Sequence, residues 1–278
     1  MATTTQPIGL MGAAADPRPF TVPDFQAVKV RGERLTVLTA YDYTMARLFD
    51  AAGVDCLLVG DSLGMVVQGL ETPLSVTVDE MIYHARLVTR GARRCLVVVD
   101  MPFMSYQVSP QQAVENAGRI IKETGAHAVK LEGGVRTVPA IEAILSADIP
   151  VMGHVGLTPQ SVNRLGGFRV QRDEEAILED ALALEKAGVF AVVIECVPSE
   201  VARKITAALK VPTIGIGAGP GCDGQVLVAH DMLGLFDEIK PRFVKQYAEL
   251  GDLILRAAAD YCRDVRQGTF PGPEHGFR

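Results

Sequence analysis

The sequence predicts a single-domain α/β protein folded as a (β/α)8 TIM barrel, and three observations lead to this prediction. Short, apolar, β-branched segments recur eight times along the chain. The segments between them carry helix start signals. Polar side chains stand at the C-terminal ends of many of the apolar segments. Strand followed by helix, repeated about eight times over roughly 250 residues, is the pattern of this fold.

The predicted strands are near-continuous hydrophobic runs rather than strict alternations of apolar and polar residues. Such runs are typical of parallel strands that are covered by helices. The eight strands are predicted over residues 34–40, 55–60, 95–100, 128–133, 150–156, 190–196, 212–219 and 225–230.

Capping residues mark where several of the intervening helices begin. Thr77 is followed three residues later by Glu80, which is the spacing of a capping box. Ser109 is followed by Pro110 at the first helical position and by Gln112 two residues further on. Further helices are predicted over 173–188, from Ser199 onward, and over 242–268.

A doubly wound open sheet is the competing fold. The barrel is favoured because polar residues end many of the strands rather than one or two. The segment between the seventh and eighth strands, "PGCDG", is too short for a helix and departs from the ideal repeat. No low-complexity linker interrupts the pattern, so we expect one catalytic domain over 22–278, preceded by a flexible arm over 1–21.

Composition narrows the classes of function. The net charge is −6 with a pI near 5.4, and the chain has no long basic block, which argues against nucleic acid as a partner. The apolar runs are too short for a membrane helix, and the N-terminus lacks the positive start of a signal peptide, so we expect a cytoplasmic protein without membrane association. The five dispersed cysteines are expected to be free thiols rather than a zinc site.

The stretch "AVKLEGG" (128–134) places two charges on one face of a predicted strand. Strand side chains alternate between faces, so Lys130 and Glu132 point the same way. Burying these charges is costly unless they are paired, bind a metal or take part in chemistry.

Equivalent positions on the other strands carry polar groups too. In a barrel, the C-terminal strand ends converge on one mouth, where active sites lie. The residues at these positions are Tyr41, Asp42, Asp61, Ser62, Asp100, Lys130, Glu132, His154 and Glu195. Four of these carboxylates, Asp61, Asp100, Glu132 and Glu195, with one lysine leave an excess of negative charge, which either shares protons or binds a cation.

The oxygen-only character of Asp61, Asp100 and Glu132 indicates a hard divalent ion. Mg²⁺ is the expected ion, and Mn²⁺ or Co²⁺ could substitute. Zinc would be expected to take histidine or cysteine ligands, and only His154 is well placed for that.

Each of these residues also has a purely structural interpretation. Asp61 and Glu195 could cap the helices that follow them, and Asp100 could serve a turn. Lys130 and Glu132 could form a buried ion pair, and His154 could bind neighbouring loops. Their joint occurrence on successive strands favours the functional interpretation.

The glycine-rich segment "GIGAGPGCDG" (215–224) is not a dinucleotide-binding fingerprint. Its third required glycine falls on Cys222, and it follows the seventh strand rather than the first. Two interpretations stay open: a backbone-lined loop that contacts an anion or cofactor, or a tight turn that needs positive φ angles.

Several long motifs resemble the ketopantoate hydroxymethyltransferase family (3-methyl-2-oxobutanoate hydroxymethyltransferases). They are "VGDSLGMVVQGLETPLSVTVDEM", "VVVDMPFMSY", "AVKLEGG", "PVMGHVGLTPQS", "AVVIECVP" and "VPTIGIGAGPGCDGQVLV". The resemblance runs from about residue 22 to about residue 270. It implies a Mg²⁺-dependent TIM barrel of the phosphoenolpyruvate mutase and isocitrate lyase superfamily.

The resemblance also implies an activity and the residues that carry it. The family transfers a hydroxymethyl group from 5,10-methylenetetrahydrofolate to 3-methyl-2-oxobutanoate, forming ketopantoate on the route to pantothenate. By motif, the metal positions fall on Asp61, Asp100 and Glu132, and substrate contacts on Asp61, Ser62, Asp100 and Lys130. The general base falls on Glu195, with His154 a possible accessory residue, and a homodecamer is implied.

The chemistry of the residues agrees with this activity. Bond formation beside a ketone needs a carboxylate that removes a proton and positive charge that stabilises the enolate. Two rivals stay open: a lyase of the same superfamily, which a catalytic cysteine in a strand-end loop would favour, and a non-catalytic metabolite-binding barrel. Neither Cys196 nor Cys222 lies in such a motif.

Overall fold

The computed structural model describes residues 18–237 and 241–277, so residues 1–17 of the predicted arm lie outside the described residues. The described part of the chain divides into two compact units, with the boundary between residues 227 and 228. The first unit contains eight parallel strands in sequential order, and β8 pairs with β1 to close the barrel. This confirms the predicted fold class. The strands are β1 Leu35–Thr39, β2 Cys56–Val59, β3 Leu96–Asp100, β4 Ala128–Glu132, β5 Val151–Gly156, β6 Ala191–Glu195, β7 Thr213–Ile216 and β8 Gly224–Leu227.

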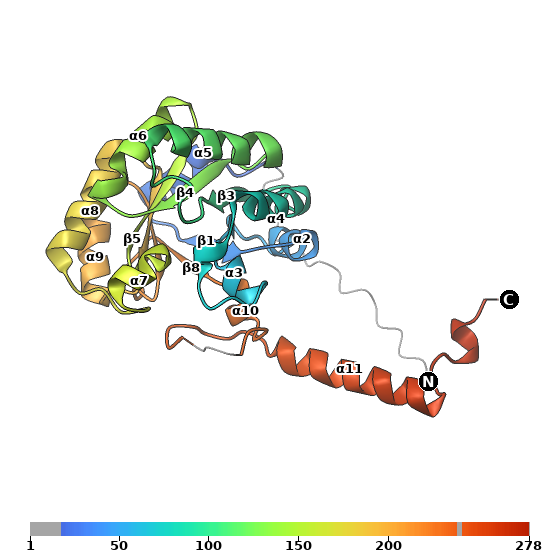
Figure 1. The fold of residues 1–278 in the computed structure, drawn as a ribbon. Coiled ribbons are helices and arrows are strands. Elements are labelled where there is room, and N and C mark those ends of the chain that lie inside the picture. Colours follow the sequence, from blue (N-terminus) through green and yellow to red (C-terminus); the bar gives the residue numbers. More distant parts are fainter. Residues whose placement is uncertain (1–17, 238–240, 278) are drawn as a thin grey trace. The chain divides into compact units, whose positions relative to one another are not determined.

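Helices connect successive strands from β1 to β7 on the outside of the barrel, whereas the described residues between β7 and β8 form no helix (Figure 1). Thr77 forms the predicted capping box with Glu80, and the Ser109 side chain accepts a hydrogen bond from the backbone N–H of Gln112. The α-helices of this unit after β1 are α2 Tyr43–Ala51, α3 Leu63–Val66, α4 Val78–Gly91, α5 Pro110–Thr124, α6 Val138–Ser146, α7 Val162–Leu165, α8 Glu174–Ala187 and α9 Ser199–Ala208. Short 3-10 turns are η1 Pro73–Ser75, η2 Val135–Thr137 and η3 Pro159–Ser161.

An apolar cluster fills the barrel toward the N-terminal ends of the strands. It contains Leu96 and Val98 of β3 and equivalent residues of the other strands. Helix α1 (Val22–Arg31) precedes β1 and adds Phe25, whose ring meets that of Phe190 edge to face with centroids 5.5 Å apart. Barrels of this kind are packed with side chains inside and carry their active sites at the C-terminal ends of the strands, so we expect the site at that end.

The glycine-rich segment makes a tight connection between β7 and β8. Gly217 and Gly219 have φ angles of 62° and 75°, which favour glycine. A Cβ on Gly219 would lie 2.1 Å from Ser199 Oγ, so close packing against α9 also requires glycine there. The turn interpretation therefore accounts for these residues without a ligand. Both strands are shorter than predicted, because residues 217–219 turn and Ala229–Met232 forms the short helix α10.

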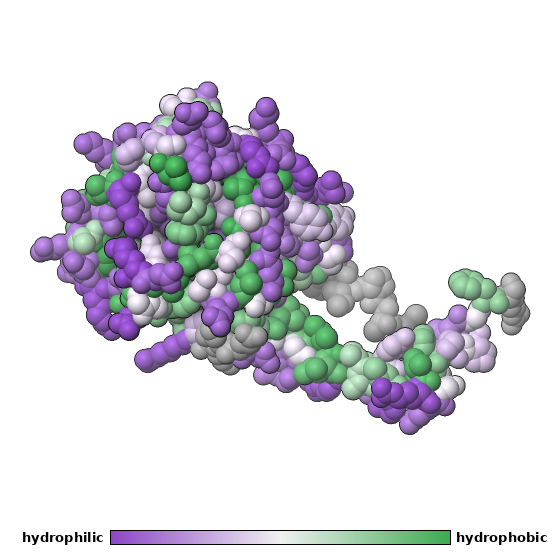
Figure 2. All heavy atoms as spheres, in the orientation of Figure 1, coloured by the Kyte–Doolittle hydropathy of each residue, from purple (hydrophilic) through white to green (hydrophobic). Residues whose placement is uncertain are grey.

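The second unit contains α10, helix α11 (Leu250–Gln267) and the 3-10 turn η4 (Pro273–His275). Helix α11 begins eight residues later than the predicted start at 242, because residues 242–249 are not helical. Exposed apolar side chains lie along α11, among them Leu253, Ile254 and Leu255 (Figure 2). Among the described residues, no helix combines the length and apolar character needed to span a membrane.

Candidate active site

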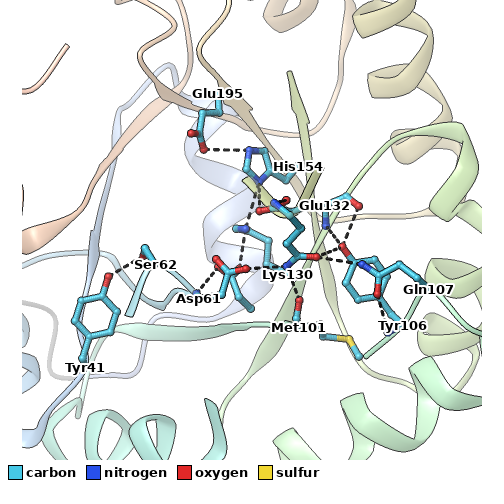
Figure 3. Close-up of polar contacts among 12 residues, drawn as sticks. Tyr41, Asp61, Ser62, Met101, Tyr106, Gln107, Lys130, Glu132, His154 and Glu195 are labelled. Atoms are coloured by element: carbon cyan, nitrogen blue, oxygen red, sulfur yellow. Dashed lines mark hydrogen bonds and ion pairs between the residues drawn. The ribbon is translucent and has the colours of Figure 1, made fainter. Parts of the chain in front are cut away.

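The C-terminal ends of β2, β3 and β4 bring Asp61, Asp100 and Lys130 together. The backbone N–H of Asp61 donates to Asp100 Oδ2 over 3.1 Å, and Lys130 Nζ lies 2.7 Å from Asp100 Oδ1 (Figure 3). All three residues are buried, with exposed fractions of 3–4%. The lysine thus pairs with the acid of the neighbouring strand, which is its register partner, rather than with Glu132 of its own strand.

A second group joins β4, β5 and β6. His154 Nδ1 lies 3.5 Å from Glu132 Oε1 and 3.3 Å from Lys130 Nζ. On the other side of the ring, His154 Nε2 lies 3.3 Å from Glu195 Oε2. The imidazole therefore bridges the two glutamates and connects the Lys130 group to Glu195 (Figure 3).

Glu195 differs from the other acids in its accessibility. Its side chain is 16% exposed, whereas those of Asp100, Glu132 and His154 are 3–5% exposed. Glu195 is the last residue of β6, and the N-cap of α9 is Pro198, so Glu195 does not cap that helix. A carboxylate with this position can reach a bound molecule while staying anchored to His154.

Tyr41 and Ser62 form the edge of the cluster nearest β1. The Tyr41 hydroxyl and Ser62 Oγ are 2.8 Å apart. The preceding Gly60 is needed here, since a Cβ would lie 2.8 Å from Ser62 Oγ and 3.5 Å from Asp100 Oδ2. Asp42 has a structural role instead, because its side chain caps α2 by accepting from the backbone N–H of Met45.

Gln160, in the 3-10 turn after β5, is a member of the cluster that sequence reasoning missed. Its side-chain Nε2 donates to Asp61 Oδ2 at 2.8 Å and to the Met101 carbonyl at 2.9 Å. Its backbone N–H donates to Glu132 Oε2 at 2.9 Å, and its Oε1 accepts from the Tyr106 hydroxyl at 2.7 Å. Gln160 thus ties two acids from different strands together. The only available signal was its place in the strand-end motif "HVGLTPQS".

The electrostatics of the cluster reflect crowded, buried acids. Burial, together with the charges of Asp100 and Glu132, raises the pKa of Asp61 well above its usual range. Burial also raises the pKa of Asp100, although Lys130 opposes the shift. Burial alone would lower the pKa of Lys130, but the surrounding acids raise it above its normal value, so the lysine is protonated at neutral pH. For Asp61, the charges of the other acids add to burial and outweigh that of Lys130, whereas for Asp100 the charge of Lys130 outweighs that of Glu132 and burial raises the pKa.

His154 carries a proton at neutral pH. Burial and the charge of Lys130 both disfavour the imidazolium. Hydrogen bonds to Glu132 and Glu195 outweigh them and raise the pKa of His154 to about 9. Burial likewise raises the pKa of Glu132, but the hydrogen bond from His154 turns the net shift downward. Protonated His154 therefore forms an ion pair with a glutamate on each side.

The carboxylates suit a hard divalent cation in their chemistry. Asp61, Asp100 and Glu132 offer buried oxygen donors with surplus negative charge, which a cation would neutralise. Across residues 18–237 and 241–277, no three His, Cys, Asp or Glu side chains already lie close enough together to hold an ion. Mg²⁺ commonly takes one or two carboxylates and fills its other positions with water and substrate, so a pair such as Asp61 and Asp100 fits it.

The cysteines do not form a nucleophilic site. Burial raises the pKa of Cys196 to about 12 and also raises the pKa of Cys222, so both stay protonated thiols at neutral pH. All five cysteines are free. The strand-end thiolate that would have favoured a lyase is therefore not present at these two positions.

Comparison with known proteins identifies relatives over nearly the whole chain. Residues 19–273 match the family model described as ketopantoate hydroxymethyltransferase. The 3-methyl-2-oxobutanoate hydroxymethyltransferase of Moorella thermoacetica is 61% identical over 262 residues, which cover 93% of this chain and 97% of the relative. The enzyme of the same name from Desulforapulum autotrophicum is 58% identical, with 94% and 99% of the two chains covered.

Solved structures share the barrel at much lower sequence identity. The phosphoenolpyruvate phosphomutase of Streptomyces platensis subsp. rosaceus superposes with a TM-score of 0.63 at 16% identity, covering 89% of this chain and 88% of the other. A 2,3-dimethylmalate lyase of the phosphoenolpyruvate mutase/isocitrate lyase superfamily gives a TM-score of 0.58 at 17% identity, with 91% and 92% covered. These likenesses establish the fold.

Proposed function

Because the chain belongs to the ketopantoate hydroxymethyltransferase family, we propose that its buried strand-end cluster is the active site of ketopantoate formation. The enzyme is a hydroxymethyltransferase that converts 3-methyl-2-oxobutanoate to ketopantoate for pantothenate biosynthesis, with 5,10-methylenetetrahydrofolate as co-substrate. The proposal concerns which residues hold the metal and the oxo acid, and which one removes the proton.

Asp61 and Asp100 would hold Mg²⁺, with Glu132 at the edge of the same site. When bound, the ion would supply positive charge beside the substrate's keto and carboxylate oxygens. Its positive charge would also oppose the burial and the acid charges that together raise the pKa of Asp61. Mn²⁺ and Co²⁺ could occupy the same oxygen donors.

Lys130 and Ser62 would orient the oxo acid. Lys130 Nζ is held 2.7 Å from Asp100 Oδ1 and stays protonated, so it presents positive charge where an enolate oxygen develops. Ser62 Oγ is held by the Tyr41 hydroxyl and can donate or accept a hydrogen bond at the substrate. The family resemblance implies substrate contacts at these two residues and also at Asp61 and Asp100.

Glu195 would be the general base that removes the proton from C3 of 3-methyl-2-oxobutanoate. The accessibility of Glu195 supports this assignment, since it is the most exposed carboxylate of the cluster and it forms an ion pair with His154. Protonated His154 forms an ion pair with Glu195 Oε2 and anchors this end of the carboxylate. The enolate carbon then forms a bond to the one-carbon unit of 5,10-methylenetetrahydrofolate, whose bonds to the two folate nitrogens break. One water supplies the hydroxyl oxygen of the product, and tetrahydrofolate leaves.

Exchange of the C3 proton tests this assignment apart from the full reaction. Glu195→Gln keeps the size and hydrogen bonding but removes the proton acceptor, so exchange should fall on the order of a hundredfold. Binding of Mg²⁺ and the oxo acid should change by no more than a few-fold, as measured by calorimetry. Glu200→Gln, an exposed glutamate of α9, is the matched control. Near-normal exchange with lost metal binding would instead place Glu195 among the ligands and make His154 the first candidate for the base.

We also propose that the enzyme works as a homo-oligomer, with a decamer implied by the family resemblance. The exposed apolar residues of α11, such as Leu253 and Leu255, support an association surface in the second unit. Sedimentation that shows a monomer at micromolar concentration would contradict this.

A further inference from the structure

A cavity of about 410 Å³ opens beside the acid cluster, between the loops that follow β3 and β4. Glu132 and Gln160 line it and also belong to the hydrogen-bonded cluster, so the cavity borders that cluster. Nothing in the proposed mechanism uses this space. Its volume lies within the range of small-molecule sites, roughly 300–1,000 Å³.

The walls of the cavity include exposed apolar side chains, which a bound ligand would cover. Phe103 and Val108, both from the loop after β3, are 37% and 62% exposed. Pro110 and Pro139 add further apolar surface. An exposed aromatic ring beside such groups suits the face of a flat heterocycle, because ring stacking gains from both burial and quadrupole geometry.

The cavity also has one cationic side chain, Arg136. Its Nη2 donates to Ser161 Oγ at 2.9 Å. Within the described part of the chain, no carboxylate forms an ion pair with Arg136, which is exposed. An arginine without an acidic partner is well suited to bind a carboxylate of a ligand.

We propose that this cavity is the folate subsite, with the pterin ring against Phe103 and a tail carboxylate at Arg136. This rests on the proposed function, which requires a folate near the oxo acid. The cavity is large enough for a reduced pterin with its one-carbon bridge. The glutamate tail of the folate would extend out through the mouth of the cavity. The Gln160 side of the cavity is the side nearest the acid cluster, so the one-carbon unit points there. The glycine-rich turn after β7 is the alternative place, but its glycines are already explained by packing.

Equilibrium binding tests the subsite without turnover. Tetrahydrofolate, which lacks the one-carbon unit, serves as the probe in calorimetry with the wild-type enzyme and two variants. Phe103→Ala and Arg136→Met should each raise its Kd about tenfold, which corresponds to the loss of one good contact of about 1.4 kcal/mol. Phe168→Ala, an aromatic residue of similar exposure on the loop after β5 and outside the cavity, is the control and should leave the Kd unchanged.

A tail-free probe separates the two contacts. A reduced pterin without the glutamate tail should bind Phe103→Ala about tenfold more weakly, yet bind Arg136→Met as it binds wild type. Folate-independent exchange at C3 of the oxo acid should stay within twofold of wild type in both variants. Unchanged tetrahydrofolate affinity in both would overturn the subsite. Absence of exchange in the wild-type enzyme would overturn the proposed chemistry instead, while the binding data would still decide the subsite.

Discussion

The same inward face of the same strands is apolar at one end of the barrel and charged at the other. On β3, Leu96 and Val98 lie in the apolar cluster, and Asp100 follows two residues later. On β4, Ala128 belongs to the apolar cluster and Lys130 to the charged one. The backbone is continuous through both layers, so the rigid apolar layer positions the charged one. Along each of these strands, the inward-facing residues near the start stabilise the fold, and those near the end form the candidate site.

The largest effect on turnover is expected from removing the charged side chain at the end of β3. Asp100→Ala removes the partner of Lys130 and of the Asp61 backbone N–H. We expect turnover to fall by more than about a hundredfold, since even outer-shell partners of metal ligands are worth 10–100-fold. Asp61→Ala should do the same, while circular dichroism shows a folded barrel in both. Calorimetry of Mg²⁺ in the presence of the oxo acid checks the cause, and unchanged affinity in both variants would rule out the ligand assignment.

The matched change in the apolar layer should act on stability alone. Leu96 is 1% exposed and lies on the same face of β3 as Asp100, four residues earlier. Leu96→Ala should lower the free energy of unfolding by about 2–5 kcal/mol, because it removes packed methyl groups and leaves a cavity. Urea denaturation measures this, and the folded fraction should keep a normal KM for the oxo acid. A strongly raised KM would mean that the apolar layer also affects substrate binding by the charged layer.

A smaller effect is expected at Gln160, which touches the charged layer from outside the strands. Gln160→Leu keeps most of the volume but removes the donors to Asp61 and the Met101 carbonyl. Its backbone bond to Glu132 is retained. We expect Mg²⁺ affinity to fall about 10- to 100-fold, as for other residues that orient metal ligands. If Mg²⁺ affinity is unchanged and only thermal stability falls, Gln160 has a packing role.

The sequence predicted the barrel and the charged strand ends, because apolar runs and their terminal polar residues are local patterns. It did not predict which charges pair. Lys130 and Glu132 share a face of β4, but Asp100 is the register partner of Lys130, and His154 is the register partner of Glu132. Register between strands depends on how the barrel closes, which local composition does not encode. Gln160 was missed for the same reason, since its partners are 28 and 99 residues away.

The smallest expected effect is a pH dependence of the free energy of unfolding, to which the charged layer contributes and the apolar layer does not. Burial and neighbouring acids raise the pKa of Asp61 far above that of the unfolded chain, so the folded state holds a proton over a pH range in which the unfolded state has lost it. Stability from this group is therefore present at low pH and is lost as pH rises through the raised pKa. The loss is at most about 1.4 kcal/mol per pH unit for one group. No residue of the apolar layer can contribute such a slope.

Asp61→Asn should flatten this dependence, because asparagine keeps the shape and cannot ionise. Urea denaturation between pH 5 and pH 8 in the presence of a chelator should show the free energy of unfolding falling more steeply for wild type than for the variant. Asp79→Asn, whose side chain is 79% exposed, is the control and should retain the wild-type slope. Adding Mg²⁺ at pH 8 should then stabilise wild type, by about 2.7 kcal/mol at a concentration of 100 times the Kd, and should stabilise Asp61→Asn much less. Equal slopes for wild type and Asp61→Asn would mean that the charged layer carries no uncompensated negative charge, and the reason for placing a cation there would be lost.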